Sequence, residues 1–305
     1  MNAVKRTLVI AMLASAAACT AILGATDVPD QAEGGAGTDA TMAADSGRGD
    51  AGGASCDVGT CVVTYAGQVM ADHPLAYWRL DEPSGSAVAI DMTGNYPGAY
   101  HGEVAFGQQG AIASDPSSSA IWLNSTGEGN GYVSVPSPFA SLSQFPNMEP
   151  YTLEVWIKPT KVDGQYRAVL SNSIEAGAGK EGYNLYVGGF TSNGTGLGFD
   201  RFDIGTSTPV HDAGAVSVNG SWYHVVVVYG GSQDSVITIY VNGGVAAQSN
   251  TLLDQQSFAG CTFDIGTNLC GTGGFFQGYV DEVAVYATAL DAGTIHAHYA
   301  AAGDP

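Results

Sequence analysis

The residue that poses the sharpest chemical question is Asp281, which stands in the otherwise apolar run Tyr279–Tyr286 beside Glu282. Burying an unpaired carboxylate in such a strand costs free energy, because the charge loses its hydration without gaining a partner. Asp281 therefore needs either a cation or several N–H donors. Two solutions are open from the residues alone: a bound metal ion, or, without any metal, backbone hydrogen bonds or a pairing with Arg79.

Paired carboxylates would indicate a glycosidase, which needs two carboxyl groups roughly 5–9.5 Å apart. The sequence offers Asp200 with Asp203, Glu154 alone in its strand, and the neighbours Asp281 and Glu282. Adjacent residues of a strand point to opposite faces, so Asp281 and Glu282 are not expected to line one cleft. A Gly-x-Ser-x-Gly elbow is also missing. No catalytic residue is predicted, and hydrolase activity is kept as the alternative.

Histidine and tryptophan are the other residue types that could bind a ligand. His296 and His298 stand two apart in a predicted terminal helix, off the i, i+4 spacing of one face, so a surface position is favoured over metal ligation. The four tryptophans occur in strand-like runs, which favours core packing over a sugar platform. They are Trp78, Trp122, Trp156 and Trp222. No ligand-binding residue is predicted.

The chain has five cysteines, an odd number that asks for an explanation in an exported protein. Cys56 and Cys61 are five apart, and Cys261 and Cys270 are nine apart, so two local disulfides are predicted, Cys56–Cys61 and Cys261–Cys270. The fifth, Cys19, follows an alanine run. A zinc site is disfavoured, because no second cysteine pair or histidine cluster has ligand spacing nearby.

The N-terminus is typical of a secretory signal, predicted over residues 1–18. Lys5 and Arg6 precede an apolar stretch that is too short to span a bilayer. The sequence Ala16-Ala17-Ala18-Cys19 resembles a bacterial lipoprotein box, which predicts lipidation of Cys19 and a bacterial cell envelope location. The alternative is ordinary cleavage and secretion, with Cys19 incidental. A flexible acidic linker rich in Gly, Ala and Asp is predicted over residues 19–71, because it lacks the apolar surface needed for folding.

Composition narrows the function further. Nine Lys and Arg against 29 Asp and Glu give a net charge of -20, which repels phosphate backbones, so no nucleic-acid partner is expected. The 45% hydrophobic content, with 15 Tyr and 10 Phe, is sufficient for a core. From about residue 72 onward the chain consists of short apolar or alternating runs separated by turn residues, which predicts an all-β sandwich or jelly roll. Residues 291–302 form the one predicted helix there, with Asp291 as its N-cap.

The predicted strands share a common pattern of short apolar or alternating residues. They are Ala76–Leu80, Ala120–Leu123, Tyr132–Val135, Tyr151–Lys158, Ala168–Ser171, Tyr183–Val187, Leu197–Phe202, Trp222–Tyr229, Val236–Val241, Cys261–Ile265 and Gly278–Tyr286.

Several phrases carry a resemblance to a known family. They are Ala76-Tyr77-Trp78-Arg79-Leu80-Asp81-Glu82, Tyr151-Thr152-Leu153-Glu154-Val155-Trp156-Ile157-Lys158, Ile239-Tyr240-Val241-Asn242-Gly243 and Gly278-Tyr279-Val280-Asp281-Glu282-Val283-Ala284-Val285-Tyr286. Together they resemble laminin G-like and concanavalin A-like jelly-roll domains of exported bacterial proteins. The resemblance implies a domain over residues 72–303, built of two antiparallel sheets whose chain ends meet at a shared edge.

The resemblance also bears on Asp281, because related jelly rolls often hold a structural Ca²⁺ near their paired terminal segments. It implies a site for one Ca²⁺ with Asp281, Asp91, Asn95 and Asp81 as ligands, and hard oxygen ligands suit that ion. The predicted function is an exported module, tethered to the membrane by its N-terminal lipid, that binds a glycan or a cell-surface protein without catalysis. The alternatives are a polysaccharide hydrolase and a purely structural envelope or adhesion module.

Overall fold

The computed structural model describes residues 55–57, 60–62, 64–124, 129–145, 149–176, 179–189, 191, 194–203, 206–210, 213–214, 216–232, 234–250 and 262–303. The predicted signal peptide, Cys19 and most of the predicted linker lie outside these residues. Among the described residues, no helix combines the length and the apolar character needed to cross a membrane.

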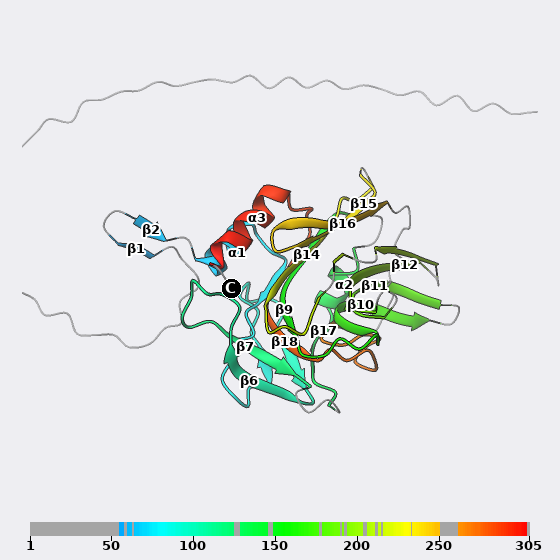
Figure 1. The fold of residues 1–305 in the computed structure, drawn as a ribbon, viewed down its shortest axis with the longest axis horizontal. Helices are drawn as coiled ribbons and strands as arrows, with labels where there is room; N and C mark the ends of the chain where they lie inside the picture. The colour runs from blue at the N-terminus through cyan, green and yellow to red at the C-terminus, as the bar shows by residue number, and fades with distance from the viewer. Residues whose placement is uncertain are drawn as a thin grey trace, which may run out of the picture. The chain divides into compact units, whose positions relative to one another are not determined.

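Two antiparallel sheets form the domain, as the sequence predicts (Figure 1). The first, named here the β10 sheet, has the order β13-β12-β11-β10-β17-β8-β5-β4. Its strands are β4 (Val88–Ala89), β5 (Gly98–His101), β8 (Tyr132–Val135), β10 (Arg167–Ala176), β11 (Gly179–Val187), β12 (Leu197–Asp203), β13 (Thr206–Val210) and β17 (Phe263–Ile265).

The second sheet, named here the β9 sheet, has the order β16-β15-β14-β9-β18-β7-β6, and β3 pairs with β18 outside this path. Its strands are β3 (Ala76–Trp78), β6 (Val104–Gln109), β7 (Ser119–Leu123), β9 (Tyr151–Pro159), β14 (Tyr223–Tyr229), β15 (Val236–Val241), β16 (Gly244–Asn250) and β18 (Gly278–Tyr286). Because β3 and β18 pair, the start and the end of the domain do meet in one sheet.

The main core lies between the two sheets and follows from the alternation of each strand. In β9, Leu153, Val155 and Ile157 all point inward and are fully buried, which confirms the face predicted for them. The side chains between them point away from the core. Trp78 also lies in this core, where it stacks on Phe263 with ring centroids 5.7 Å apart.

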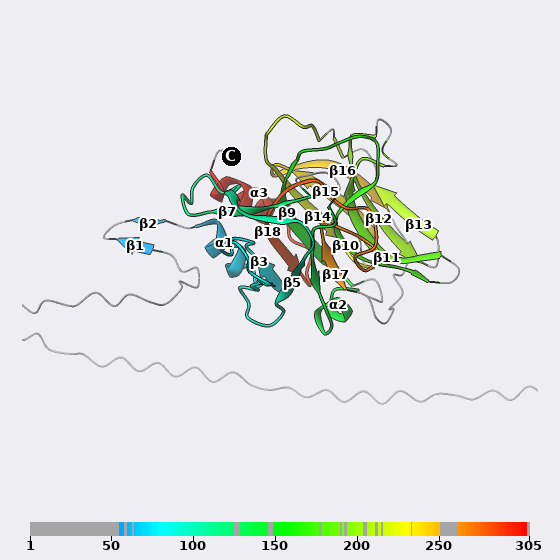
Figure 2. The ribbon, with the colours of Figure 1, turned by 90° about the horizontal axis from the view of Figure 1, so that it is seen from below.

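Two helices cover the outer face of the β9 sheet. Figures 1 and 2 show α1 (Tyr65–Ala71) and α3 (Ala292–Ala301) side by side there. Thr64 caps α1, and Asp291 caps α3 by accepting a hydrogen bond from the Thr294 N–H, as predicted. The remaining short helix, α2 (Phe139–Leu142), lies between β8 and β9 in the chain.

The position of α1 corrects the predicted boundary between linker and domain. Tyr65 and Val69 are buried in a second apolar cluster with Trp156 and Tyr286, so the folded domain begins before residue 72. The prediction of a linker up to residue 71 was wrong at this end, because the glycine- and acid-rich composition that supports it stops before Cys56.

Glu154 is the polar centre of this helix-covered face and is fully buried. Its carboxylate accepts hydrogen bonds from the hydroxyls of Tyr65 and Tyr286, at 2.9 and 3.0 Å. His224 Nε2 lies 2.8 Å from Glu154 Oε1, and His298 Nδ1 lies 3.0 Å from Oε2. Four donors from different elements thus converge on one carboxylate, which fixes both helices to the sheet.

His298 links the two helices directly, because its Nε2 lies 2.8 Å from Asp72 Oδ2 just after α1. His298 is buried, so the surface position predicted for it was wrong, although His296 is exposed as expected. Burial alone would lower the pKa of His298, but the charge of Glu154 and the hydrogen bonds to Glu154 and Asp72 raise it to about 9. Burial alone would raise the pKa of Glu154, but His298 and His224 hold it well below its usual value.

The pKa of His298 generates a prediction about alkaline stability. Because the folded-state pKa exceeds the unfolded value of about 6.5, the stabilisation is complete below pH ~6.5 and is lost as the pH rises through about 9. The wild-type protein should lose up to about 3 kcal/mol of its unfolding free energy across this window. His298→Gln should flatten that dependence in denaturant titrations, whereas His296→Gln should keep it. Parallel profiles for wild type and His298→Gln would contradict this assignment.

The cysteine pairings remain predictions that the structure makes specific. In the hairpin of β1 (Ser55–Asp57) and β2 (Thr60–Val62), Cys56 and Cys61 stand directly opposite each other. Cys270 is disulfide-bonded, and Cys261 lies outside the described residues. Mass spectrometry of a non-reducing digest should find one peptide pair linked through Cys261 and Cys270 and another through Cys56 and Cys61. Peptides linking one pair to the other would refute this scheme.

Candidate functional site

A cleft of about 410 Å³ opens on the outer face of the β9 sheet. One wall is the segment 109–118, which connects β6 to β7 and contributes Gln109, Asp115 and Ser118. The opposite wall holds Lys158 near the end of β9 and residues 220–222 just before β14. The cleft thus lies between segments far apart in the sequence, and the strand pairing of the β9 sheet brings them together.

Aromatic rings and one ammonium group form the second wall and its surroundings. Tyr279 of β18 pairs with Lys158 of β9 on one side and with Trp122 of β7 on the other. Trp122 stacks on Tyr279 with ring centroids 5.0 Å apart. The Lys158 Nζ lies 4.3 Å from the Tyr279 centroid and 4.9 Å from that of Trp222, within the range of cation–π attraction. Partial burial lowers the pKa of Lys158.

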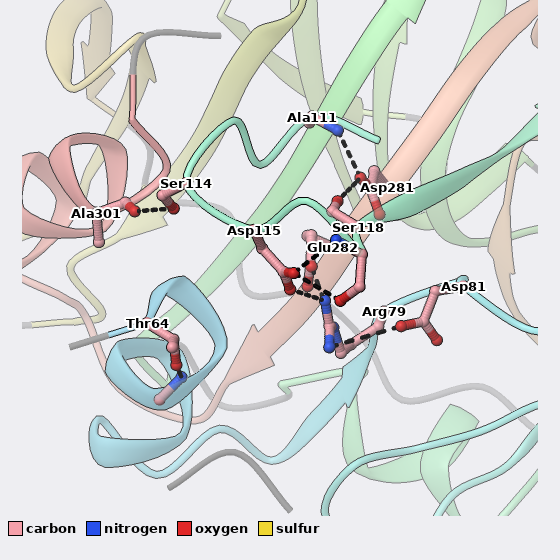
Figure 3. Close-up of polar contacts among 12 residues, drawn as sticks. Thr64, Arg79, Asp81, Ala111, Ser114, Asp115, Ser118, Asp281, Glu282 and Ala301 are labelled. Atoms are coloured by element: carbon pink, nitrogen blue, oxygen red, sulfur yellow. Dashed lines mark hydrogen bonds and ion pairs between the residues drawn. The ribbon is translucent and has the colours of Figure 1, made fainter. Parts of the chain in front are cut away.

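Asp281 holds the segment 109–118 in place (Figure 3). Its Oδ2 accepts a hydrogen bond from the Ala111 N–H at 2.8 Å and a longer one from the Ser118 hydroxyl at 3.4 Å. These donors agree in part with the metal-free alternative for Asp281, because they reach only Oδ2, while Oδ1 is buried without a hydrogen-bond partner. Burial and the negative charge of Glu282 raise the pKa of Asp281 well above its usual value. Asp281 therefore positions one wall of the cleft and does not itself line it.

Arg79 supplies the positive charge of this corner and touches three carboxylates (Figure 3). Its Nε lies 3.2 Å from Glu282 Oε1, its Nη2 lies 3.0 Å from Asp115 Oδ2, and its Nη1 lies 3.5 Å from Asp81 Oδ2. Glu282 also accepts a hydrogen bond from the Tyr77 hydroxyl. Burial raises the pKa of Glu282 to about 7, although Arg79 and Tyr77 oppose that rise. Asp115 belongs to the cleft wall, so Arg79 fixes that wall to β18.

A β-bulge overturns the prediction that Asp281 and Glu282 point to opposite faces. The pairing of β18 with β9 shifts between Asp281 and Ala284, and Glu282 has φ of 51°, which breaks the strand alternation. Both carboxylates therefore lie beside the segment 109–118 (Figure 3). Their relative exposures are 0% and 1%, so no substrate can reach them as a catalytic pair.

The predicted calcium ligands do not come together at one site. Asp91 is buried, and its two oxygens accept hydrogen bonds from the N–H groups of Tyr77 and residues 93, 95 and 96 and from the Thr93 hydroxyl. Asn95 is exposed at that turn, and Asp81 pairs with Arg79. Within the described part of the chain, no three His, Cys, Asp or Glu side chains are placed to share a metal ion. N–H donors and the Thr93 hydroxyl occupy the oxygens of Asp91, and Arg79 pairs with Asp81, whereas Asp281 Oδ1 is buried without a hydrogen-bond partner, so a shared calcium site stays a prediction.

The sequence profile of the concanavalin A-like lectin/glucanases superfamily matches residues 126–296, more than half of the chain. The chain belongs to this superfamily. No curated protein matches the chain significantly in sequence.

Solved structures share the fold of this concanavalin A-like domain at low sequence identity. Domain 4 of AbnA, a GH43 extracellular arabinanase from Geobacillus stearothermophilus in complex with arabinotriose, has a TM-score of 0.53 and 17% identity, covering 74% of this chain and 98% of that one. The botulinum neurotoxin serotype G binding domain has a TM-score of 0.51 and 14% identity, covering 74% and 50%. The binding domain of Paraclostridial Mosquitocidal Protein 1 has a TM-score of 0.51 and 16% identity, covering 73% and 51%. The match spans about half the length of these two toxin domains.

The outer face of the β10 sheet carries the other carboxylates of this concanavalin A-like domain. Strand pairing places Asp200, Asn184, Ser171 and Asp264 in one row across β12, β11, β10 and β17. Asp200 and Asp264 are three strand spacings apart, roughly 14 Å, which exceeds the separation in a glycosidase. Burial raises the pKa of Asp264 to about 7, and its carboxylate accepts hydrogen bonds from Thr262 and Gly271. Asp264 thus holds a turn and does not form a catalytic pair with Asp200.

No motif in the sequence predicts the cleft on the outer face of the β9 sheet. Trp78 and Trp156 are fully buried and Trp222 is 8% exposed within the second apolar cluster, which confirms core packing for three tryptophans. Trp222 also borders the cleft, and Trp122 is half-buried on the same face. The signal that could have found them is Lys158, which with Glu154 is one of two charges on the outward face of β9. Segment 109–118 carried no signal, because its small residues read as a plain loop.

The stability of the domain should depend on the positive charge of Arg79 beside Glu282 and Asp115, and not on a bound metal ion. Arg79→Met should lower the unfolding free energy by about 3 kcal/mol, because it leaves Glu282 and Asp115 without their cation. Lys161→Met, which removes an exposed pair with Asp163, should cost less than about 1 kcal/mol. Excess EDTA should leave the Tm of the wild type unchanged. A Tm that falls with EDTA and recovers with Ca²⁺ would show that Arg79 is not sufficient.

Proposed function

We propose that this protein is an exported binding module, tethered to the cell envelope by a lipid on Cys19, that recognises a carbohydrate in the cleft without catalysis. The observation that carries the proposal is the chemistry of the cleft walls. Trp222 offers an apolar ring, while Gln109, Ser118, Ser221 and Lys158 offer hydrogen-bonding groups. A site with an apolar surface and a few convergent polar groups is typical of small-molecule recognition.

The fixed walls of the cleft support a binding role. Asp281 and Arg79 hold the segment 109–118, and the stacked rings of Tyr279 and Trp122 lie beside Lys158. A site whose walls are held before the ligand arrives loses little conformational entropy on binding. Domain 4 of AbnA is in complex with arabinotriose, a carbohydrate, which agrees with this role, although at 17% identity the likeness concerns the fold.

The hydrolase alternative has less support. The acids nearest the cleft are engaged structurally, since Asp281 binds Ala111 and Arg79 binds both Asp115 and Glu282. Glycoside hydrolysis requires one acid to protonate the leaving group and another to attack or activate water. In the described residues we find no exposed pair of carboxyl groups around the cleft that could divide these tasks.

Glycan binding by the mature chain tests the proposal. The wild type should bind a subset of glycans on an array and release no reducing sugar from common polysaccharides. Trp222→Ala should weaken that binding about tenfold or more, because it removes the aromatic surface of the cleft. The matched control is Phe275→Ala, which removes a half-buried ring from a different cavity lined by Tyr166 and Arg167.

Each other outcome of that experiment rejects part of the proposal. Loss of binding in Phe275→Ala but not in Trp222→Ala would move the site to the second cavity. Release of reducing sugar would indicate the hydrolase. No glycan binding at all would favour a cell-surface protein as the partner, or a purely structural role.

A further inference from the structure

Arg201 is a buried cation on the inward face of the β10 sheet. It follows Leu197 and Phe199 on the core side of β12, and its relative exposure is 0%. None of its three guanidinium nitrogens has a hydrogen-bond partner, and no ion pair joins it to a carboxylate in the described part of the chain. Its neighbour Asp200 cannot serve, because alternation places Asp200 on the opposite face of the strand.

Tyrosine rings form the surroundings of this guanidinium. Its central carbon lies 4.1 Å from the ring centroid of Tyr229 and 5.8 Å from that of Tyr151. Tyr183 stands opposite Arg201 in the pairing of β11 with β12, and its ring lies 5.6 Å from that of Tyr151. The hydroxyl of Tyr151 is buried and also lacks a hydrogen-bond partner, whereas that of Tyr183 interacts with Ser143. One end of the sandwich interior therefore concentrates N–H and O–H donors around a positive charge.

This arrangement is incomplete as it stands. Removing an unpaired charge from water costs several kcal/mol even after the protein relaxes. Cation–π attraction to a buried ring contributes about 2 kcal/mol, which does not offset that cost. Unsatisfied donors also each carry a penalty, and buried groups without partners usually mark an unseen water or ion. An anion would both neutralise the Arg201 guanidinium and accept hydrogen bonds from the donors that lack partners.

We propose that the sandwich interior binds a small monovalent inorganic anion, of the halide class, at Arg201 with the hydroxyl of Tyr151. The site is internal, since Arg201 and Tyr151 have 0% exposure and Phe145 stacks on Tyr151 with centroids 4.6 Å apart. A monoatomic anion fits this enclosure because it accepts hydrogen bonds from any direction and needs no donors of its own. The site is separate from the cleft, and its role is to complete the core.

Bromide makes the site directly observable in the wild-type protein. Crystals of the mature chain grown with bromide in place of chloride should show an anomalous peak within hydrogen-bond distance of the Arg201 guanidinium. This measurement needs no variant, so a folding defect cannot obscure it. A guanidinium bonded only to water, or to a carboxylate of the chain, would overturn the proposal.

Thermal stability provides the second measurement. At constant ionic strength, with gluconate as the balancing anion, the wild-type Tm should rise by about 3–5 °C for each tenfold increase of bromide above its dissociation constant. Arg201→Met keeps the apolar stem and should abolish this dependence. Arg167→Met, at an arginine already paired with Asp163, should retain it. A wild-type Tm indifferent to bromide, or a dependence that survives in Arg201→Met, would refute the anion site.

Discussion

Glu154, Asp281 and Glu282 lie buried on the outer face of the β9 sheet, and a buried carboxylate is stable only with donors or cations beside it. Each of the three binds a different part of the chain. Glu154 binds Tyr65 of α1 and His298 of α3. Asp281 binds the segment 109–118, and Glu282 pairs with Arg79. The requirement of these buried carboxylates for donors or cations thus determines which segments cover the outer face of the β9 sheet.

The buried carboxylates and their partners also hold one wall of the cleft. Segment 109–118 is rich in small residues and contributes little apolar surface of its own, so Asp281 and Arg79 provide the contacts that define its path. The opposite wall depends on rings stacked across β7 and β18 and on Lys158 above them. Both walls of this binding surface are therefore held by contacts within the domain, and Trp222 and the polar groups lie along the cleft.

The sequence predicts a strand and its buried face well where apolar residues alternate with a period of two. It predicts them less well where a single residue interrupts that alternation. The alternation of Leu153, Val155 and Ile157 predicts β9 and its inward face correctly. At Glu282 a positive φ reverses the expected orientation, and no composition marks it. His298 was placed at the surface because its helical spacing to His296 was considered, whereas its partner Glu154 lies 144 residues away. Short strands such as β4 and β5 escaped prediction because they are too brief to show a period.

The helix α1 is seven residues long and is the first helix of the described chain, packed on the outer face of the β9 sheet. Its attachments are the burial of Tyr65 and Val69, the Tyr65–Glu154 hydrogen bond and the Asp72–His298 contact. A mechanical load applied from the N-terminal side reaches these contacts before it reaches any strand of the two large sheets. Detachment of α1 is then the first event under force, and the strands that carry the cleft are loaded only after it.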